Sequence, residues 1–396
     1  MNEFEALLNL PEEEKKRRGV EFTPPEIAQQ PATWAKAAQI VAKRAGEIKA
    51  FMKTAGLLGK KDATLILTGA GSSEFVGNAV EHVLRKRLKR EVMSIPTTHF
   101  VTHPANVFVP GKNYVVLSFA RSGNSPESMA TYNLVKKVCP AAKQIAITCN
   151  KDGKLAQAAK TDQNSLYLEL PEETNDQSLV MTSSYSTMAF TACGLCFLDD
   201  AAGLANLAAS LGAAGQRIIK EYGGVLHKFA QQKFNRACFL GTNALWGAMQ
   251  ECHLKMQEMT EGQVAAMFNS FVGLRHGPQV FANKDCIIVA ALACEPYVRK
   301  YELDLLRELK AKKQGCGTLV ICDRATPEIR DLCTDLLELF PQGDPVNDDF
   351  RIMTDVMVGQ ILGTFKSMQC GLKPDNPSVS GTINRVVQGV AIYPYE

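Results

Sequence analysis

From Thr64 onward, short apolar runs with strand pattern alternate with longer segments of helical pattern, and this alternation narrows the fold more than any other feature. The strand-like runs of the first half are residues 64–68, 91–95, 114–119, 144–148 and 165–170. The segments between them are long enough for crossover helices, so the sequence predicts an α/β fold with a parallel, doubly wound sheet. Upstream, residues 23–60 have the pattern of two helices, with Trp34 on the apolar face. Residues 187–232 are helical in pattern, with breaks expected at Gly203, Gly212 and Gly223-Gly224.

The alternation restarts in the second half of the chain. Strand-like runs at 236–240, 286–292, 318–322 and 336–340 alternate with helical segments, of which the first extends to about Thr260. The opening Phe239-Leu-Gly-Thr-Asn-Ala244 resembles Leu67-Thr-Gly-Ala-Gly-Ser72, and a repeat at this separation indicates a duplicated domain. A chain of 396 residues also exceeds one ordinary core. We expect an N-terminal helical segment (1–50), a first domain (51–205), a second domain (216–373) and a C-terminal tail (374–396).

Two turns in the first half are rich in small hydroxyl residues. Gly69-Ala-Gly-Ser-Ser-Glu74 and Ala120-Arg-Ser-Gly-Asn-Ser-Pro-Glu127 each follow a strand-like run and open a helical segment. A helix N-terminus offers unpaired N–H donors and a partial positive charge, which suits a phosphate. Neither turn has the lysine of a nucleotide P-loop or the full glycine pattern of a dinucleotide fold. The sequence therefore predicts a single phosphate on a small molecule.

The second half lacks both serine-rich turns, so we expect one phosphate pocket per chain. It contains instead two kinds of candidate acid–base group. Glu258 and Glu261 lie near the end of its first helical segment, and Glu258 follows an apolar face beside a glycine. His276 precedes Gly-Pro, which ends any helix at that point, and histidine is a residue type suited to proton transfer near neutral pH.

Composition excludes several classes of protein. The 44 basic and 41 acidic residues leave a net charge of +3, without the footprint of a nucleic-acid-binding protein. The run Lys15-Lys-Arg-Arg18 follows Glu12-Glu-Glu14, as expected of a solvated helix face. The sequence shows no signal peptide and no membrane-spanning run, so we expect a cytoplasmic protein with reduced cysteines. Cys193-Gly-Leu-Cys196 is interpreted as part of a core helix, and we expect neither a metal nor a cofactor.

The motifs resemble those of sugar isomerase (SIS) domain proteins and, more narrowly, the AgaS family of two-SIS-domain sugar-phosphate isomerases and deaminases. The resemblance extends from about residue 23 to the C-terminus, and the matching segments are Glu26–Trp34, Ser118–Ser128, Glu258–Gly262, Phe271–Pro278 and Asn384–Val390. It implies two tandem SIS domains, each with a flavodoxin-like parallel sheet flanked by helices, and a C-terminal tail that closes the site.

The resemblance also implies a phosphorylated amino sugar as substrate. Galactosamine 6-phosphate would be converted to tagatose 6-phosphate and ammonia. By matching position with glucosamine-6-phosphate synthase, Glu258 would move a proton between C1 and C2. His276 would open the sugar ring from a neighbouring subunit, which implies a homodimer or a larger homo-oligomer with shared sites.

The substrate-binding residues implied by the resemblance belong to three segments. Hydroxyls at Ser73, Ser122 and Ser125 would hold the phosphate, and those at Thr182 and Ser183 would contact the sugar. The full expected set is Gly71, Ser72, Ser73, Arg121, Ser122, Asn124, Ser125, Thr182, Ser183 and Ser184.

Two departures from the synthase leave alternatives open. Val387 stands where the synthase has a C-terminal lysine. Glu258 is two residues further from His276 than the corresponding pair, which requires an insertion in a 262–272 loop and keeps Glu261 as an alternative base.

Three other functions also fit the sequence. They are deamination of glucosamine 6-phosphate, aldose–ketose isomerisation without loss of nitrogen, and non-catalytic sensing of a sugar phosphate. The sensor is disfavoured because residues 1–50 lack a helix-turn-helix pattern.

Overall fold

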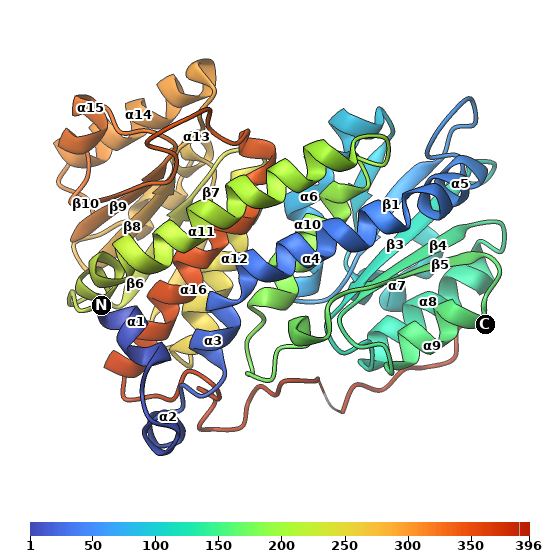
Figure 1. Cartoon of the computed structure of the whole chain (residues 1–396), viewed down its shortest axis with the longest axis horizontal. Coiled ribbons are helices and arrows are strands. Elements are labelled where there is room, and N and C mark those ends of the chain that lie inside the picture. Colours follow the sequence, from blue (N-terminus) through green and yellow to red (C-terminus); the bar gives the residue numbers. More distant parts are fainter. Residues whose placement is uncertain (388) are drawn as a thin grey trace. The chain divides into compact units, whose positions relative to one another are not determined.

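The computed structural model describes residues 1–387 and 389–396, and its internal contacts divide the chain into two compact units, each with one five-stranded sheet (Figure 1). Unit 1 comprises Met1–Pro31, Gln177–Thr182 and Ala209–Thr382. Unit 2 comprises Ala32–Asp176, Ser183–Ala208 and Ile383–Glu396.

The sheet of unit 2 has the strand order β2-β1-β3-β4-β5, and every neighbouring pair is parallel. Its strands are β1 (Thr64–Thr68), β2 (Val92–Ser94), β3 (Tyr114–Ala120), β4 (Lys143–Thr148) and β5 (Ser165–Glu169). The helices of this unit are α5 (Ala45–Ala55), α6 (Ser72–Leu88), α7 (Thr97–Thr102), η1 (Pro104–Asn106), α8 (Pro126–Val138), α9 (Lys154–Thr161), η2 (Glu172–Thr174) and α10 (Ser183–Gly194). Two further helices, α4 (Gln30–Lys43) and α11 (Ala201–Ala230), contain a unit boundary in their sequence.

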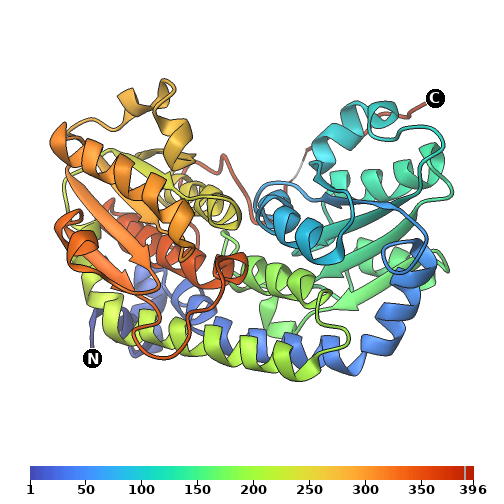
Figure 2. The same cartoon turned by 90° about the horizontal axis from the view of Figure 1, so that it is seen from above.

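Burial explains why the central strands of unit 2 are apolar along their whole length. Every residue of β1 and β3 is buried, as expected for a parallel sheet covered on both faces (Figure 2). Trp34 is also fully buried, as predicted, and its indole N–H donates to Ser186 Oγ at 3.0 Å.

The sheet of unit 1 has the order β10-β9-β8-β6-β7, again with parallel pairs. Its strands are β6 (Arg236–Leu240), β7 (Ala265–Asn269), β8 (Cys286–Ala291), β9 (Gly317–Cys322) and β10 (Asp335–Glu338). Its helices are α1 (Glu3–Leu8), α2 (Glu12–Arg18), α3 (Thr23–Ala28), α12 (Ala244–Met259), α13 (Phe271–Leu274), η3 (Pro278–Phe281), α14 (Pro296–Ala311), α15 (Pro327–Asp331), η4 (Asp348–Phe350) and α16 (Ile352–Gln369). Helix α12 packs closely on α16, where a Cβ at Gly359 would lie 2.5 Å from Cys252 Sγ.

The two sheets repeat one topology. Numbered within its own unit, each has the flavodoxin-like order 2-1-3-4-5, which confirms the predicted fold class. The repetition extends to backbone angles: Gly71 before α6 has φ 57° and ψ −130°, and Asn243 before α12 has φ 56° and ψ −122°. A Cβ at Gly69 would lie 2.4 Å from the Ser73 carbonyl, and one at Gly241 would lie 2.4 Å from the Leu245 carbonyl. Both glycines let a helix start directly against its strand.

Three element predictions differ from the structure. Residues 23–60 contain α3, α4 and α5 rather than two helices. The predicted 262–272 loop contains the edge strand β7, whose residues are only partly buried. Helix α11 continues through Gly203, Gly212 and Gly223-Gly224, so the predicted breaks are wrong.

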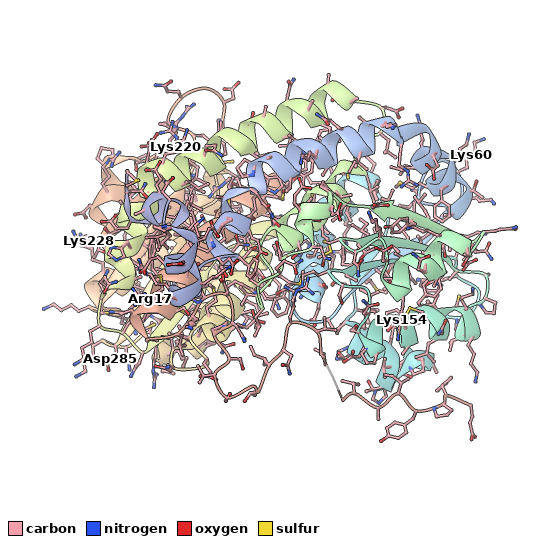
Figure 3. The ribbon with its side chains drawn as sticks, turned by 60° about the horizontal axis from the view of Figure 1, so that its bottom comes forward. Arg17, Lys60, Lys154, Lys220, Lys228 and Asp285 are labelled. Atoms are coloured by element: carbon pink, nitrogen blue, oxygen red, sulfur yellow. The ribbon has the colours of Figure 1, made fainter. Side chains whose placement is uncertain are left out.

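The glycines of α11 serve close packing. A Cβ at Gly223 would lie 2.4 Å from Asn2 Oδ1, and one at Gly203 would lie 2.1 Å from Asp200 Oδ2. The Asn2 side chain also donates to the carbonyls of Ile219 and Lys220, both at 2.8 Å, and Lys220 is labelled in Figure 3.

The charged run near the N-terminus forms the short helix α2. As predicted for a solvated helix face, none of its residues is buried. Lys15 pairs with Glu12 at 3.1 Å and Arg17, labelled in Figure 3, pairs with Glu14 at 2.6 Å.

Candidate active site

The first serine-rich turn joins β1 to α6 in unit 2. Gly71 is the N-cap of α6, and its positive φ is a conformation that glycine adopts without strain. Ser72 and Ser73 follow as the first two helical residues and are buried. Thr97 N–H donates to the Gly69 carbonyl at 2.8 Å, which fixes the turn from the other side. The N-terminus of a 17-residue helix is thus held at the end of a buried strand.

The second turn joins β3 to α8. Ser125 is the N-cap of α8 and accepts from Ser128 N–H at 3.2 Å, and Pro126 occupies the first helical position. Ser122 Oγ accepts from Asn124 N–H at 3.2 Å. Asn124 Oδ1 accepts from the N–H of Lys154, the residue at the start of α9 that is labelled in Figure 3.

Both turns lie at one edge of the unit 2 sheet. Strands β1 and β3 are neighbours, with Thr68 opposite Ser118, and their carboxyl ends lead into α6 and α8. The chain goes from β1 to β2 on one side and continues with β3 on the other, so this is the topological switch point at which such sheets bind ligands. Two helix N-termini at this edge favour an anion.

Arg121 connects the second turn to the C-terminal tail. Its side chain is buried, and Nη2 donates to the carbonyl of Arg385 at 2.6 Å. Arg385 in turn donates through Nε to the Asp176 carbonyl at 2.8 Å and through Nη2 to Asn175 Oδ1 at 2.9 Å. Sequence reasoning does not single out Arg385, although it lies in the matching segment Asn384–Val390.

Asp176 organises the start of α10. Its carboxylate accepts from Ser183 Oγ at 2.5 Å, from Ser184 N–H at 2.9 Å and from Ser184 Oγ at 2.5 Å. These contacts commit both serine hydroxyl protons to Asp176, and both serines are fully buried. Thr182 belongs to unit 1, where its carbonyl accepts from Gln360 Nε2 at 3.3 Å.

Glu258 lies on α12 in unit 1 and forms an ion pair with Lys255. Lys255 is fully buried and lies 3.2 Å from Glu251 Oε1, also buried. Burial alone would lower the pKa of Lys255, but Glu251 and Glu258 raise it above the usual lysine value. Lys255 therefore stays a cation between two carboxylates. Sequence reasoning missed it, although a Glu–Lys–Glu stripe at spacings of four and three on an apolar helix was a readable signal.

Glu261 has a different environment. It follows α12 with φ 49°, and its Oε1 accepts from Ser380 N–H at 2.7 Å. This backbone hydrogen bond is the main reason that the pKa of Glu261 is lowered. Glu261 thus holds the Ser380 segment.

His276 is exposed on a braced loop of unit 1. On either side of it, Arg275 Nε and Gln279 Nε2 donate to Glu308 at 2.7 and 3.0 Å. Hydrogen bonds from Lys312, Gln279 and Arg275 lower the pKa of Glu308 to about 2. Hydrogen bonds on either side therefore hold the backbone of the loop in place, while the His276 imidazole is exposed at the surface.

The structure thus distributes the predicted residues over both units. Unit 2 holds nine of the ten predicted substrate-binding residues, which lie in the first turn, the second turn and the start of α10, and it also holds the tail from Ile383 onward. Unit 1 holds Glu258, His276 and Thr182. Val387, at the position of the synthase lysine, is 51% exposed.

Within residues 1–387 and 389–396, no group of three or more His, Cys, Asp or Glu side chains is arranged to hold a metal ion. No helix in this described part is long and apolar enough to cross a membrane.

Comparison with known proteins gives a consistent set of relatives. The SIS domain family matches residues 57–195 of this chain. The D-galactosamine-6-phosphate deaminase AgaS of Escherichia coli is 32% identical over 95% of this chain and 96% of its own length. The protein of the same name from Shewanella sp. (strain ANA-3) is 32% identical over 98% of this chain and 96% of its own. The crystal structure of tagatose-6-phosphate ketose/aldose isomerase from Escherichia coli matches with a TM-score of 0.85 and 29% identity, over 94% of this chain and 96% of that chain.

Proposed function

The chain belongs to the AgaS family of SIS-domain proteins, and on this basis we propose that it is an enzyme that converts galactosamine 6-phosphate into tagatose 6-phosphate and ammonia. The observation that carries the proposal is the 32% identity to D-galactosamine-6-phosphate deaminases along nearly the whole chain. The two serine-rich turns at the switch point of unit 2 supply the phosphate anchor that this substrate requires.

The phosphate turns hold the end of the sugar that does not react. Backbone N–H groups at the starts of α6 and α8, with the hydroxyls of Ser73, Ser122 and Ser125, would bind the phosphate. Binding energy from this remote group positions C1 and C2 for chemistry.

Glu258 would carry the proton transfer. After ring opening, its carboxylate takes the C2 proton of the open-chain amino aldehyde while O1 gains a proton from solvent, which gives an enolamine. The same carboxylic acid returns the proton to C1, which gives an iminium ion at C2 that becomes the imine when its nitrogen loses a proton to solvent. Water then adds to this imine and ammonia leaves, so the net reaction is a C–N hydrolysis. The Lys255 ammonium supports this role because it pairs with the Glu258 carboxyl and holds it in place.

The contacts of Glu258 and Glu261 support Glu258 as the base. Glu258 lies against a buried cation, whereas Glu261 is occupied by the backbone N–H of Ser380. Ser183 and Ser184 are fully buried and donate to Asp176, so they would hold the start of α10 in the position that the sugar requires.

We also propose that His276 acts on the substrate of a neighbouring copy. Its exposure on a loop braced by Glu308 supports this role. Exposed Val272, Val280 and Tyr297 on α13, η3 and α14 of the same unit provide apolar surface for a second copy. The protein would then be a homodimer or a larger homo-oligomer.

A cytoplasmic location is the further part of the proposal. All 12 cysteines lie in the described part of the chain and are free, as expected of a reducing compartment.

Isomerisation without loss of nitrogen is the second candidate, because the related Escherichia coli structure is a tagatose-6-phosphate ketose/aldose isomerase. Both reactions use the same proton shuttle, so the fold does not separate them. The test is to incubate the protein with galactosamine 6-phosphate, glucosamine 6-phosphate and tagatose 6-phosphate and to measure ammonia and ketose. The proposal predicts ammonia from galactosamine 6-phosphate in preference to its gluco epimer. Binding without any turnover would instead identify a sensor.

A further inference from the structure

The unit 1 sheet carries a turn whose backbone donors are occupied by a carboxylate of the same chain. Asp348, at the start of η4, accepts from Cys294 N–H at 2.9 and 2.8 Å through its two oxygens. Its Oδ2 also accepts from Glu295 N–H at 3.4 Å and from the Cys294 thiol at 3.2 Å. This turn connects β8 to α14.

The β8–α14 turn corresponds to the second serine-rich turn of unit 2. In each unit the turn follows the third strand of the sheet and opens a helix with proline at its first position, Pro126 in α8 and Pro296 in α14. The N-cap side chain accepts from the N–H three residues later in both cases, Ser125 from Ser128 and Glu295 from Val298. The turn also lies at the same place in the sheet, since β8 is the neighbour of β6 as β3 is of β1.

The surroundings of Asp348 complete the pattern of an anion site. Arg351 is fully buried and donates through Nη1 to Asp348 Oδ1 at 3.1 Å. The same guanidinium pairs with Asp355 at 2.7 Å and donates to the Leu292 carbonyl at 2.7 Å, which fixes its position. Two turn N–H groups and one arginine therefore converge on a single carboxylate, a donor set that would equally suit a small inorganic anion.

We propose that Asp348 is an internal anion that fills the unit 1 counterpart of the phosphate-binding turn, so that each chain binds phosphate only through unit 2. The phosphate-binding role of the unit 2 turn rests on the proposed function. The contacts of Asp348 are observed independently of it. Asp348 explains why unit 1 binds no second phosphate although it keeps the sheet topology and the helix start.

Removal of the carboxylate should expose these donors. In Asp348→Ala the Cys294 and Glu295 N–H groups lose their acceptor and Arg351 loses one of its two carboxylate partners, so inorganic phosphate should bind there. Asp348→Asn is the matched control because it keeps the size of the side chain and one acceptor oxygen, and therefore still blocks the site.

The test is thermal unfolding of the full-length protein over a phosphate titration, with chloride added to keep the ionic strength constant. Asp348→Ala should unfold at a lower temperature than the wild type in chloride and regain stability as phosphate is added. Its apparent phosphate affinity from the melting shift should exceed that of the wild type and of Asp348→Asn about tenfold. If Asp348→Ala is unfolded in chloride, recovery of a cooperative transition with phosphate supports the proposal, and no recovery overturns it.

An Asp348→Ala variant that is destabilised but responds to phosphate as the wild type does would also overturn the proposal, because Asp348 would then only brace its own loop. The readout is unfolding with inorganic phosphate, so a failed deaminase assay of the wild type leaves this test unaffected.

Discussion

Glu258 and Lys255 lie one turn apart on α12 and form the charged pair on which the proposed chemistry depends. A general base contributes about a hundred- to ten-thousandfold to a rate. We expect Glu258→Gln to lose ammonia release by a factor in this range while sugar-phosphate binding, measured by thermal shift, stays nearly unchanged. Glu261→Gln is the matched control and should retain activity. Full activity of Glu258→Gln would remove it from the mechanism.

Substitutions of Lys255 distinguish its contribution to stability from its contribution to catalysis. Lys255→Met should leave the buried Glu251 without its cation, which costs about 3–5 kcal/mol in the free energy of unfolding. The double variant Lys255→Met/Glu251→Gln should recover much of this stability but not the activity, because Glu258 still lacks its partner. Denaturant unfolding and ammonia release measure the two effects, and recovery of full activity in the double variant would show that Lys255 is only structural.

Arg385 is the tail residue that links the second turn to Asp176. Arg385→Ala should remove the side-chain donor to the carbonyls of Asn175 and Asp176 and so loosen the tail, whose Arg385 carbonyl accepts from Arg121. We expect KM for the sugar phosphate to rise about 10- to 100-fold with a smaller change in kcat. Arg385→Lys keeps the charge but not the forked geometry of the guanidinium, so its KM should lie between those of the wild type and Arg385→Ala. An unchanged KM for Arg385→Ala would limit the tail to a packing role.

Among the helices and strands, α14 contains a buried carboxyl, Glu302, that makes the stability of the fold depend on pH. Burial raises the pKa of Glu302 to about 7. Hydrogen bonds from the Thr242 side chain and the Ala293 N–H lower the pKa, whereas the negative charge of Asp348 raises it further. A carboxyl with a raised pKa stabilises the fold at low pH, and this stability is lost as pH rises from about 4.5 through about 7. The shift corresponds to about 3 kcal/mol.

Glu302→Gln should therefore unfold at a higher temperature than the wild type at pH 8 and show little difference at pH 5. The amide keeps an acceptor for Ala293 N–H, which donates to Glu302 Oε2 at 2.8 Å. Melting curves between pH 5 and 8 measure the effect. Parallel curves for the two proteins would show that Glu302 does not titrate in this range.

Local pattern predicts the elements whose burial is uniform. Strands β1 and β6 have the predicted bounds because each has an apolar centre between turns. The edge strand β7 lacks that signal, since only part of its surface is covered. The break predicted at Gly223 is wrong because the close neighbour of this glycine, Asn2, is distant in the sequence and reaches it only in the folded chain.

In the candidate site, too, local features can be predicted from the sequence and long-range contacts cannot. The serine-rich turns are readable because small hydroxyl residues at a helix start are a local feature. Arg385 is not readable, because its contact with Asp176 joins positions 209 residues apart. The role of Lys255 depends on its complete burial, which an apolar helix face indicates only weakly.

At the scale of the whole molecule, duplication has been followed by specialisation. Unit 2 has the serine-rich turns proposed to bind phosphate, and unit 1 has Glu258 and His276, while Asp348 accepts from the N–H of its own β8–α14 turn. If His276 acts in the site of a neighbouring copy, as proposed, two variants that are inactive alone should recover activity when they are mixed in one oligomer.

Glu258→Gln and His276→Asn should each be inactive alone. When they are unfolded and refolded together in equal amounts, half of the dimers are mixed, and each mixed dimer has one site with both native residues. Activity should then return to about a quarter of the wild-type value. No recovery, in a preparation shown to contain mixed dimers, would mean that both residues act within one chain.

The central claim is that this chain releases ammonia from galactosamine 6-phosphate. An NMR time course of the purified protein with this substrate follows the amino sugar, the ketose phosphate and ammonium together. We predict that tagatose 6-phosphate and ammonium appear in equal amounts as the substrate disappears. Binding of the substrate without either product, or a protein that interconverts tagatose 6-phosphate and its aldose while leaving the amino sugar intact, would contradict the claim.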